Sequence, residues 1–253
     1  MLAQTKGLSP REFRDRFCEP GGMRLRFDGA PGWSDQPACS QYVPNFGCSV
    51  HKGRPLACRL YPLGRQQQRG EHHYIYQGED FPCMDGCPEV MSLPQLTVAE
   101  YIIGQEVKSF EIAQESYLEL MQNLADAAFV LFLESGLAAS GDRTTLHVWR
   151  TMGKEDPDEL ATRLGPQWID RLTLPELSEH LSDPIPFCRK HSDQLFFQAQ
   201  ESFGSLKNLP EYGAASCTMM GLALHLGRGL GANPATLVEH WIKTAKKEQD
   251  ALG

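Results

Sequence analysis

The chain has 253 residues and a formal net charge of −8, from 24 basic and 32 acidic residues. A chain of this length can bury a hydrophobic core, so its eight cysteines are not needed merely to hold a small fold together. The acidic balance excludes a general phosphate-backbone binder, which needs a basic face. The N-terminus lacks the apolar segment of a signal peptide, and the longest apolar run, residues 127–133, is too short to span a bilayer. We therefore expect a cytoplasmic protein with no nucleic-acid or membrane partner, and leave a protein partner and the oligomeric state open.

The first 95 residues predict one short helix followed by irregular chain. Ser9 is a typical N-cap and Glu12 completes a capping box, which predicts a helix over 10–17. Residues 18–94 are rich in glycine and proline and show no sustained helical period. Two pieces in this stretch resemble strands, at residues 23–27 and 72–77. Because such a segment holds few aliphatic side chains, we expect a bound metal to stabilise it.

Helix dominates after Pro94. Thr97 and Glu100 form a second capping box, followed by an amphipathic run to Phe110. Further helices are predicted over 114–134, from near 156–157, 175 and 186, over 212–226 and over 233–249, with a short strand over 144–149. We predict a mainly α protein in which an irregular, cysteine-rich, metal-binding module with short β pieces (residues 1–95) packs on a helical domain (residues 96–253).

Five of the eight cysteines lie within 49 residues of loop-like sequence. They are Cys39, Cys48, Cys58, Cys83 and Cys87. Turns bring such thiols together, and in a reducing compartment clustered thiols are more often metal ligands or redox groups than disulfides. We expect Cys39, Cys48, Cys58 and Cys87 to be the ligands, with Cys83 as a substitute or fifth thiol. A disulfide pair and separate buried thiols are the alternatives.

The spacing of these cysteines bears on the metal. There are no tandem CxxC knuckles, which disfavours a zinc ribbon or finger, whereas the larger iron–sulfur cluster tolerates irregular spacing. Arg54 and Arg59 flank Cys58, where a guanidinium would lower a thiol pKa and donate hydrogen bonds to an anionic cluster. Ordinary salt bridges to nearby acids are the alternative for both arginines. We favour an iron–sulfur cluster, with zinc as the alternative cofactor.

Residues 48–64, CSVHKGRPLACRLYPLG, resemble a family signature, CxIYxxRPxxCRxYP. The signature belongs to a cysteine-cluster family, named for an N-terminal CxxCxxCC motif, whose domains are described as chelating zinc or iron. Cys39, the Cys87–Pro88 pair and the segment from Thr97 also resemble family features, so the likeness covers about residues 1–104. The CxxCxxCC motif itself is not in this chain; either the true start lies upstream or this member keeps a reduced site.

The resemblance implies metal binding and adds an enzymatic hypothesis, because some relatives are flagellin lysine N-methylases. Three functions are therefore open: a metal-binding or electron-transfer protein, a lysine N-methylase-like enzyme, and an interaction module with a structural zinc. The residues do not decide whether the chain is an enzyme, and they identify no catalytic group. The only Gly-rich candidate for a cofactor turn, residues 227–231, follows a helical pattern and is predicted to be a helix end.

Overall fold

The computed structural model describes residues 1–68, 71–76, 92–177 and 183–252. Helix makes up 62% of the structure and the described strands form two two-stranded sheets, so the prediction of a mainly α fold is confirmed. The chain divides into two compact units. The first comprises Met1–Cys18 and Leu25–Ile112, and the second comprises Glu19–Arg24 and Ala113–Gly253. The predicted domain division at residues 95–96 falls inside the first unit and stays a prediction about where an independent domain would end.

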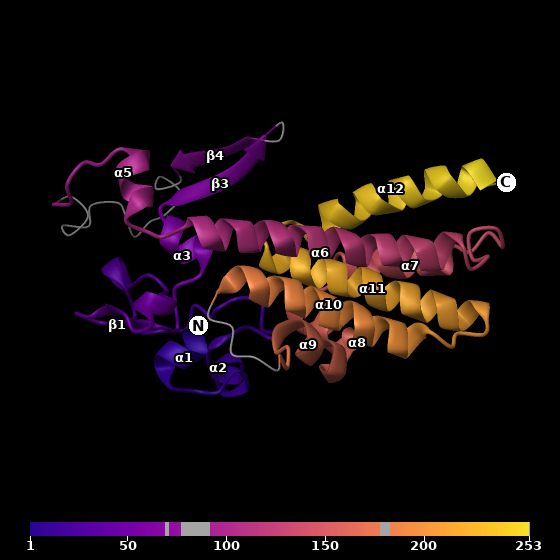
Figure 1. Cartoon of the computed structure of the whole chain (residues 1–253), viewed down its shortest axis with the longest axis horizontal. Helices are drawn as coiled ribbons and strands as arrows, with labels where there is room; N and C mark the ends of the chain where they lie inside the picture. The colour runs from indigo at the N-terminus through magenta and orange to yellow at the C-terminus, as the bar shows by residue number, and fades with distance from the viewer. Residues whose placement is uncertain (69–70, 77–91, 178–182, 253) are drawn as a thin grey trace. The chain divides into compact units, whose positions relative to one another are not determined.

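Short elements make up the first unit (Figure 1). They are α1 (Leu2–Lys6), α2 (Pro10–Phe17), η1 (Trp33–Asp35), β1 (Tyr42–Val43), β2 (Gly47–Cys48), η2 (His51–Gly53), α3 (Leu56–Leu60), β3 (Leu63–Gln68), β4 (Glu71–Tyr76) and α5 (Val98–Ile103). Both predicted capping boxes are present. In α2 the Ser9 hydroxyl accepts from the Glu12 backbone N–H, while the Glu12 carboxylate accepts from the Ser9 N–H. Thr97 and Glu100 repeat the arrangement at α5.

The two sheets of the first unit are antiparallel hairpins. Strand β1 pairs with β2, and β3 pairs with β4 in the register Leu63 opposite Tyr76. The strand predicted over 72–77 is confirmed over 72–76 as part of β4, and residue 77 lies outside the described residues. The strand predicted over 23–27 is wrong: only an isolated bridge joins Cys18 to Leu25. The reason is the turn just before it, in which the Glu19 N–H donates to the Arg24 carbonyl and reverses the chain.

A small apolar cluster lies between α3, β3 and the segment around Val107 in the first unit. Its buried members are Leu56, Leu60 and Val107, and partly buried side chains including Tyr74 and Phe110 pack around them. A cluster of this size removes little apolar surface from water for a unit of about a hundred residues. Polar contacts therefore carry a large share of the stability of this unit.

Long helices make up the second unit. They are α6 (Lys108–Leu133), which begins in the first unit, α7 (Thr144–Met152), α8 (Pro157–Leu164), α9 (Pro166–Thr173), α10 (Pro184–Phe203), α11 (Leu209–Gly229) and α12 (Pro234–Leu252). Figure 1 shows α6, α10 and α11 running alongside one another. Helix α11 is buried along most of its length and contacts α7, α8, α9 and α12. The core around it includes Phe132, Trp149 and Leu222, each completely buried.

Several predicted helices of the second unit are confirmed, with shifted ends. The segments predicted over 114–134, 212–226 and 233–249 correspond to α6, α11 and α12, and α8 begins at Pro157 as expected. Residues 227–231 are a helix end, with Gly231 at φ 95°. The predicted strand over 144–149 is wrong, because those residues belong to α7. The helix predicted to start near Pro175 is not present at residues 175–177. Helix α9, which was not predicted, begins at Pro166, and α10 begins two residues before the predicted start at Pro186.

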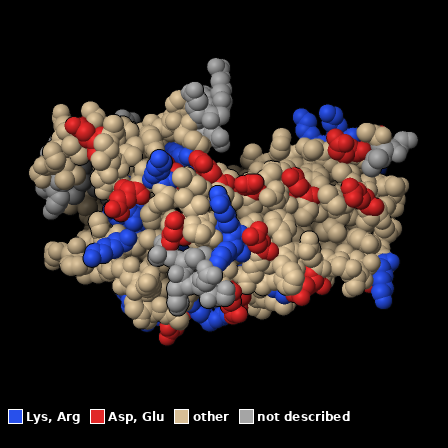
Figure 2. All heavy atoms as spheres, in the orientation of Figure 1, with Lys and Arg blue, Asp and Glu red and all other residues tan. Residues whose placement is uncertain are grey.

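The surface carries mixed charge. On the face drawn in Figure 2, basic and acidic side chains of the described residues are interspersed over the helices. In the described part of the chain, no helix is both long enough and apolar enough to cross a membrane.

Candidate metal-binding site

Cys39 and Cys48 lie at the open end of the β1–β2 hairpin. Tyr42 is paired with Cys48 across the two strands, and its N–H donates to the carbonyl of Cys39 at 2.8 Å. Asn45 and Gly47, at φ 62° and 91°, form the tight turn; the left-handed conformation favours both residue types. The hairpin thus brings together two thiols that are nine positions apart in the sequence.

A buried polar network, which the sequence analysis did not find, holds the open end of this hairpin. The Gln41 side chain is 1% exposed, and the Ser49 hydroxyl donates to its Oε1 at 3.2 Å. Lys6 Nζ donates to the same hydroxyl at 2.8 Å, and the Ser49 N–H donates to the Gln41 carbonyl at 2.9 Å. Isolated Gln and Ser residues in a loop leave no periodic signal, so only the folded chain reveals their role.

Cys58 lies on α3, between two leucines that face the small core. Leu56 and Leu60 are buried, whereas Cys58 is half-buried on another side of the helix. The pKa of the Cys58 thiol is raised, first by burial and then by the charges of Cys39 and Cys48. The structure therefore places Cys39 and Cys48, from the hairpin, close enough to Cys58, from α3, for their charges to act on its thiol.

Two groups act on the sulfurs of this cluster. The backbone N–H of Gln41 donates to Sγ of Cys39 at 3.5 Å. The charge of Arg54 lowers the pKa of Cys58, against the larger effect of burial. Arg54 is oriented by donating from Nε to the His51 carbonyl at 3.2 Å and from Nη2 to Gln105 Oε1 at 3.0 Å.

Arg59 has a different environment. Its side chain is 6% exposed and donates to three backbone carbonyls: Arg54 at 2.9 Å, Gln105 at 2.8 Å and Lys52 at 3.1 Å. The guanidinium also stacks 4.2 Å from the centre of the Phe110 ring. These contacts join the loop before α3 to the start of α6. The predicted contact between Arg59 and a thiol or cluster stays a prediction.

Cys83 and Cys87, the remaining predicted ligands, lie outside the described residues. Among the described residues, no group of three or more His, Cys, Asp or Glu side chains has a geometry that could hold a metal ion as it stands. The six described cysteines are all free thiols, so the disulfide alternative has no support in this part of the chain. The donor set is suited to a soft metal, but the three described thiols alone do not close a shell around one.

The remaining cysteines and histidines named here, all within the described residues, belong to other elements of the fold. His51 is exposed in η2, and His72 and His73 lie on β4 opposite Gln67 and Gln66. Cys18 takes part in the isolated bridge to Leu25. Within the second unit, Cys188 is buried and Cys217 is half-buried against the core.

Cys188 lies beside a hydrogen-bonded chain that the sequence did not predict. His191 Nε2 is 2.9 Å from the Arg171 carbonyl, which can only accept, so Nε2 carries the proton. His191 Nδ1 then accepts from the Tyr117 hydroxyl at 2.9 Å, and Tyr117 also affects the pKa of the Cys188 thiol. The spacing of Cys188 and His191 on α10 was the one available signal, and it did not indicate that Tyr117 on α6 completes the network.

Comparison with known proteins adds no relative. Scans of family models, curated proteins and solved structures return no match to this chain. The resemblance to the cysteine-cluster family stays a prediction that depends on the signature residues.

Proposed function

We propose that the first unit chelates a metal through clustered thiolates and that the bound group is an iron–sulfur cluster, with zinc as the alternative. Cys39, Cys48 and Cys58 would be three ligands, and Cys87 or Cys83 would supply the next. The observation that carries the proposal is that Cys39 and Cys48, from the hairpin, lie close enough to Cys58, on α3, for their charges to raise the pKa of its thiol, while all three are outside any disulfide.

Two features of the first unit support this proposal. Its apolar cluster is small, and metal binding supplies folding energy to units with small cores. The environment of Cys39 includes the Gln41 N–H, which donates to its sulfur, and the charge of Arg54 partly offsets the rise in the pKa of Cys58. A bound cluster would supply a one-electron redox centre, whereas zinc would supply rigidity alone. In either case the chain contributes ligands, charge compensation and the turns that position them.

The test is metal content with an absorbance spectrum, on protein purified without oxygen. We expect iron and acid-labile sulfide in stoichiometric amounts, with visible absorbance that bleaches reversibly on reduction. Cys48→Ser and Cys58→Ser should each lose the metal. Cys217→Ser is the matched control, because it removes a half-buried thiol in the second unit and should retain full metal content.

Each result discriminates among the functions. If the protein contains stoichiometric, colourless zinc that is lost in the same two variants, the bound group is a structural zinc ion and not an iron–sulfur cluster. Protein that stays free of metal after reconstitution with iron and sulfide, or with zinc, would refute chelation. So would metal content that is unchanged by Cys48→Ser and Cys58→Ser.

A further inference from the structure

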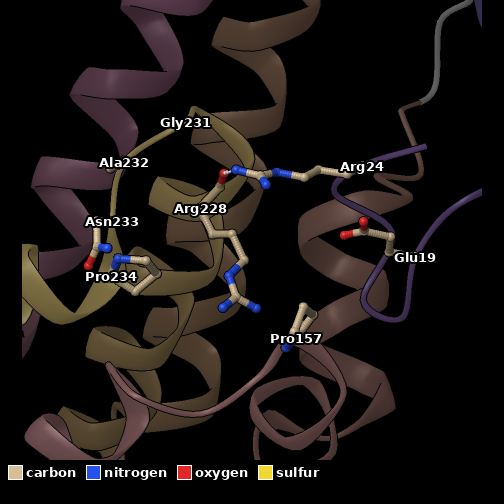
Figure 3. Close-up of a pocket in the computed structure, with 8 residues that line it drawn as sticks. All are labelled: Glu19, Arg24, Pro157, Arg228, Gly231, Ala232, Asn233 and Pro234. Atoms are coloured by element: carbon tan, nitrogen blue, oxygen red, sulfur yellow. Dashed lines mark hydrogen bonds between the residues drawn. The ribbon is translucent and has the colours of Figure 1, made fainter. Parts of the chain in front are cut away.

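A pocket of about 470 Å³ lies within the second unit, away from the cysteines of the proposed metal site in sequence (Figure 3). Its walls come from the loop 19–24, the first residue of α8, the end of α11 and the loop leading into α12. The volume is in the range of sites that bind small molecules. The charged residues among its lining are Glu19, Arg24 and Arg228.

The loop 19–24 is held in place before any ligand binds. The Glu19 N–H donates to the Arg24 carbonyl at 2.8 Å, and His225 Nε2 is 3.0 Å from the Gly21 carbonyl, to which it donates. Gly21 has φ 78°, and a Cβ there would lie 2.4 Å from the His225 ring. Only glycine fits this close approach, which fixes Glu19 and Arg24 in the pocket wall.

Arg228 has a hydrogen-bond donor without a partner. Its Nη2 reaches the Glu155 carbonyl at 3.4 Å, whereas Nη1 is buried and makes no hydrogen bond. Arg24, the other basic residue, donates from Nη2 to the Arg228 backbone carbonyl at 2.7 Å. The Arg228 guanidinium lines the pocket as a whole, and its positive charge would attract an oxyanion there.

A carboxylate lines the same pocket. Glu19 is half-buried, and no ion pair within 4.0 Å joins it to Arg24 or Arg228. Figure 3 shows the Glu19 carboxylate and the Arg228 guanidinium apart from one another, on different segments, with the Arg228 side chain extending toward Pro157. A simple anion would be repelled by Glu19, and a simple cation would be repelled by Arg228.

We propose that this pocket binds a small zwitterion of the α-amino acid type. Its carboxylate would pair with the part of the Arg228 guanidinium that lines the pocket, and its ammonium group would pair with Glu19. The first turn of α12 lines the pocket at Asn233 and Pro234, and the positive end of that 19-residue helix favours a carboxylate on the same side. A ligand with both charges satisfies both groups, as neither a lone anion nor a lone cation does.

The first experiment compares glycine and L-alanine with their charged halves, acetate and methylammonium, and with inorganic phosphate. Binding is followed by amide chemical shifts of the full chain. We expect saturable binding of an amino acid, at least ~10-fold tighter than any single-charge probe, a ratio that corresponds to ~1.4 kcal/mol. The proposal is overturned if acetate or phosphate binds as tightly, or if neither amino acid binds saturably below ~10 mM.

Substitutions test the assignment of each group. Glu19→Gln and Arg228→Met should each weaken amino-acid binding at least ~10-fold, because each leaves one ligand charge unpaired. Arg189→Met is the control: it removes an exposed charge on α10 and should leave binding unchanged. If the Glu19→Gln variant binds more tightly, the pocket takes a simple anion and the zwitterion is refuted. If Arg228→Met does not fold, Arg228→Lys is the second variant. It keeps the positive charge but loses the planar guanidinium with its paired N–H donors, and should still weaken binding.

Discussion

Arg59 is predicted to be the residue on which the first unit depends most strongly for stability. The change Arg59→Met keeps much of the side-chain volume and removes the guanidinium. Three carbonyls, at 2.8, 2.9 and 3.1 Å, then lose their donor inside a unit whose apolar cluster has three buried members. A hydrogen bond to a charged group contributes about 1.5–3 kcal/mol, but such bonds on one side chain are not additive. We expect a loss of about 3–5 kcal/mol, the range measured when one partner of a buried charged contact is removed.

Hydrogen exchange of the α3 and β3 amides measures this loss for the first unit alone. Arg150→Met is the control, since Arg150 makes an exposed pair with Glu239 at 2.5 Å and should cost less than about 1 kcal/mol. Arg59→Lys should recover only part of the loss, because one ammonium group cannot reach three carbonyls in a planar fork. Exchange rates in Arg59→Met within threefold of the unsubstituted chain, a difference of about 0.7 kcal/mol, would refute the reasoning.

Two further predictions concern buried titratable groups of the second unit. Burial lowers the pKa of His191 and His225, so the unfolded state, with a histidine pKa of about 6.5, takes up protons first. Stability should therefore be level above about pH 6.5 and fall below it by up to about 1.4 kcal/mol per pH unit for each histidine, until the folded pKa is reached. Denaturant unfolding across this range checks the slope, which should be smaller in His191→Gln; a flat profile would contradict it. Burial also raises the pKa of Cys188 to about 11 and of Cys217 to about 12, so both should alkylate at least ~100-fold more slowly at about pH 8 than an exposed thiol. Peptide mass spectrometry after iodoacetamide labelling measures this, and labelling at the rate of a free thiol would show that burial is transient.

Local signals in the sequence predicted the helix starts well. The capping boxes at Ser9 and Thr97 use side-chain contacts between residues three apart, so nothing distant decides them. Proline at the first helical turn located α8 and, within two residues, α10. These features are written in a few adjacent residues, which is why their structural outcome follows from the sequence.

Secondary structure that depends on burial was predicted less well. Residues 144–149 contain two threonines and a valine, which favour strand, yet they form α7. The deciding feature is that Leu146, Trp149 and Met152 recur at helical spacing and all face the core built by α11 and α12. Burial of these side chains in the core of the second unit therefore outweighed the local preference for a strand. That preference contributes less free energy than the burial of one tryptophan side chain.

The same distinction between local and long-range contacts applies to the candidate site. The sequence by itself determined that this is a mainly α chain and that its thiols gather in a loop-rich stretch, because composition and turns within about twenty residues set both. Only the tertiary structure decided that Arg54 acts on Cys58 while Arg59 joins the loop before α3 to the start of α6, and that Gln41 is buried. It alone brought Glu19 and Arg228 to one pocket across more than two hundred residues. The physical reason is that caps and turns are contacts between neighbours in the chain, whereas burial and charge pairing depend on which distant segments the fold brings together.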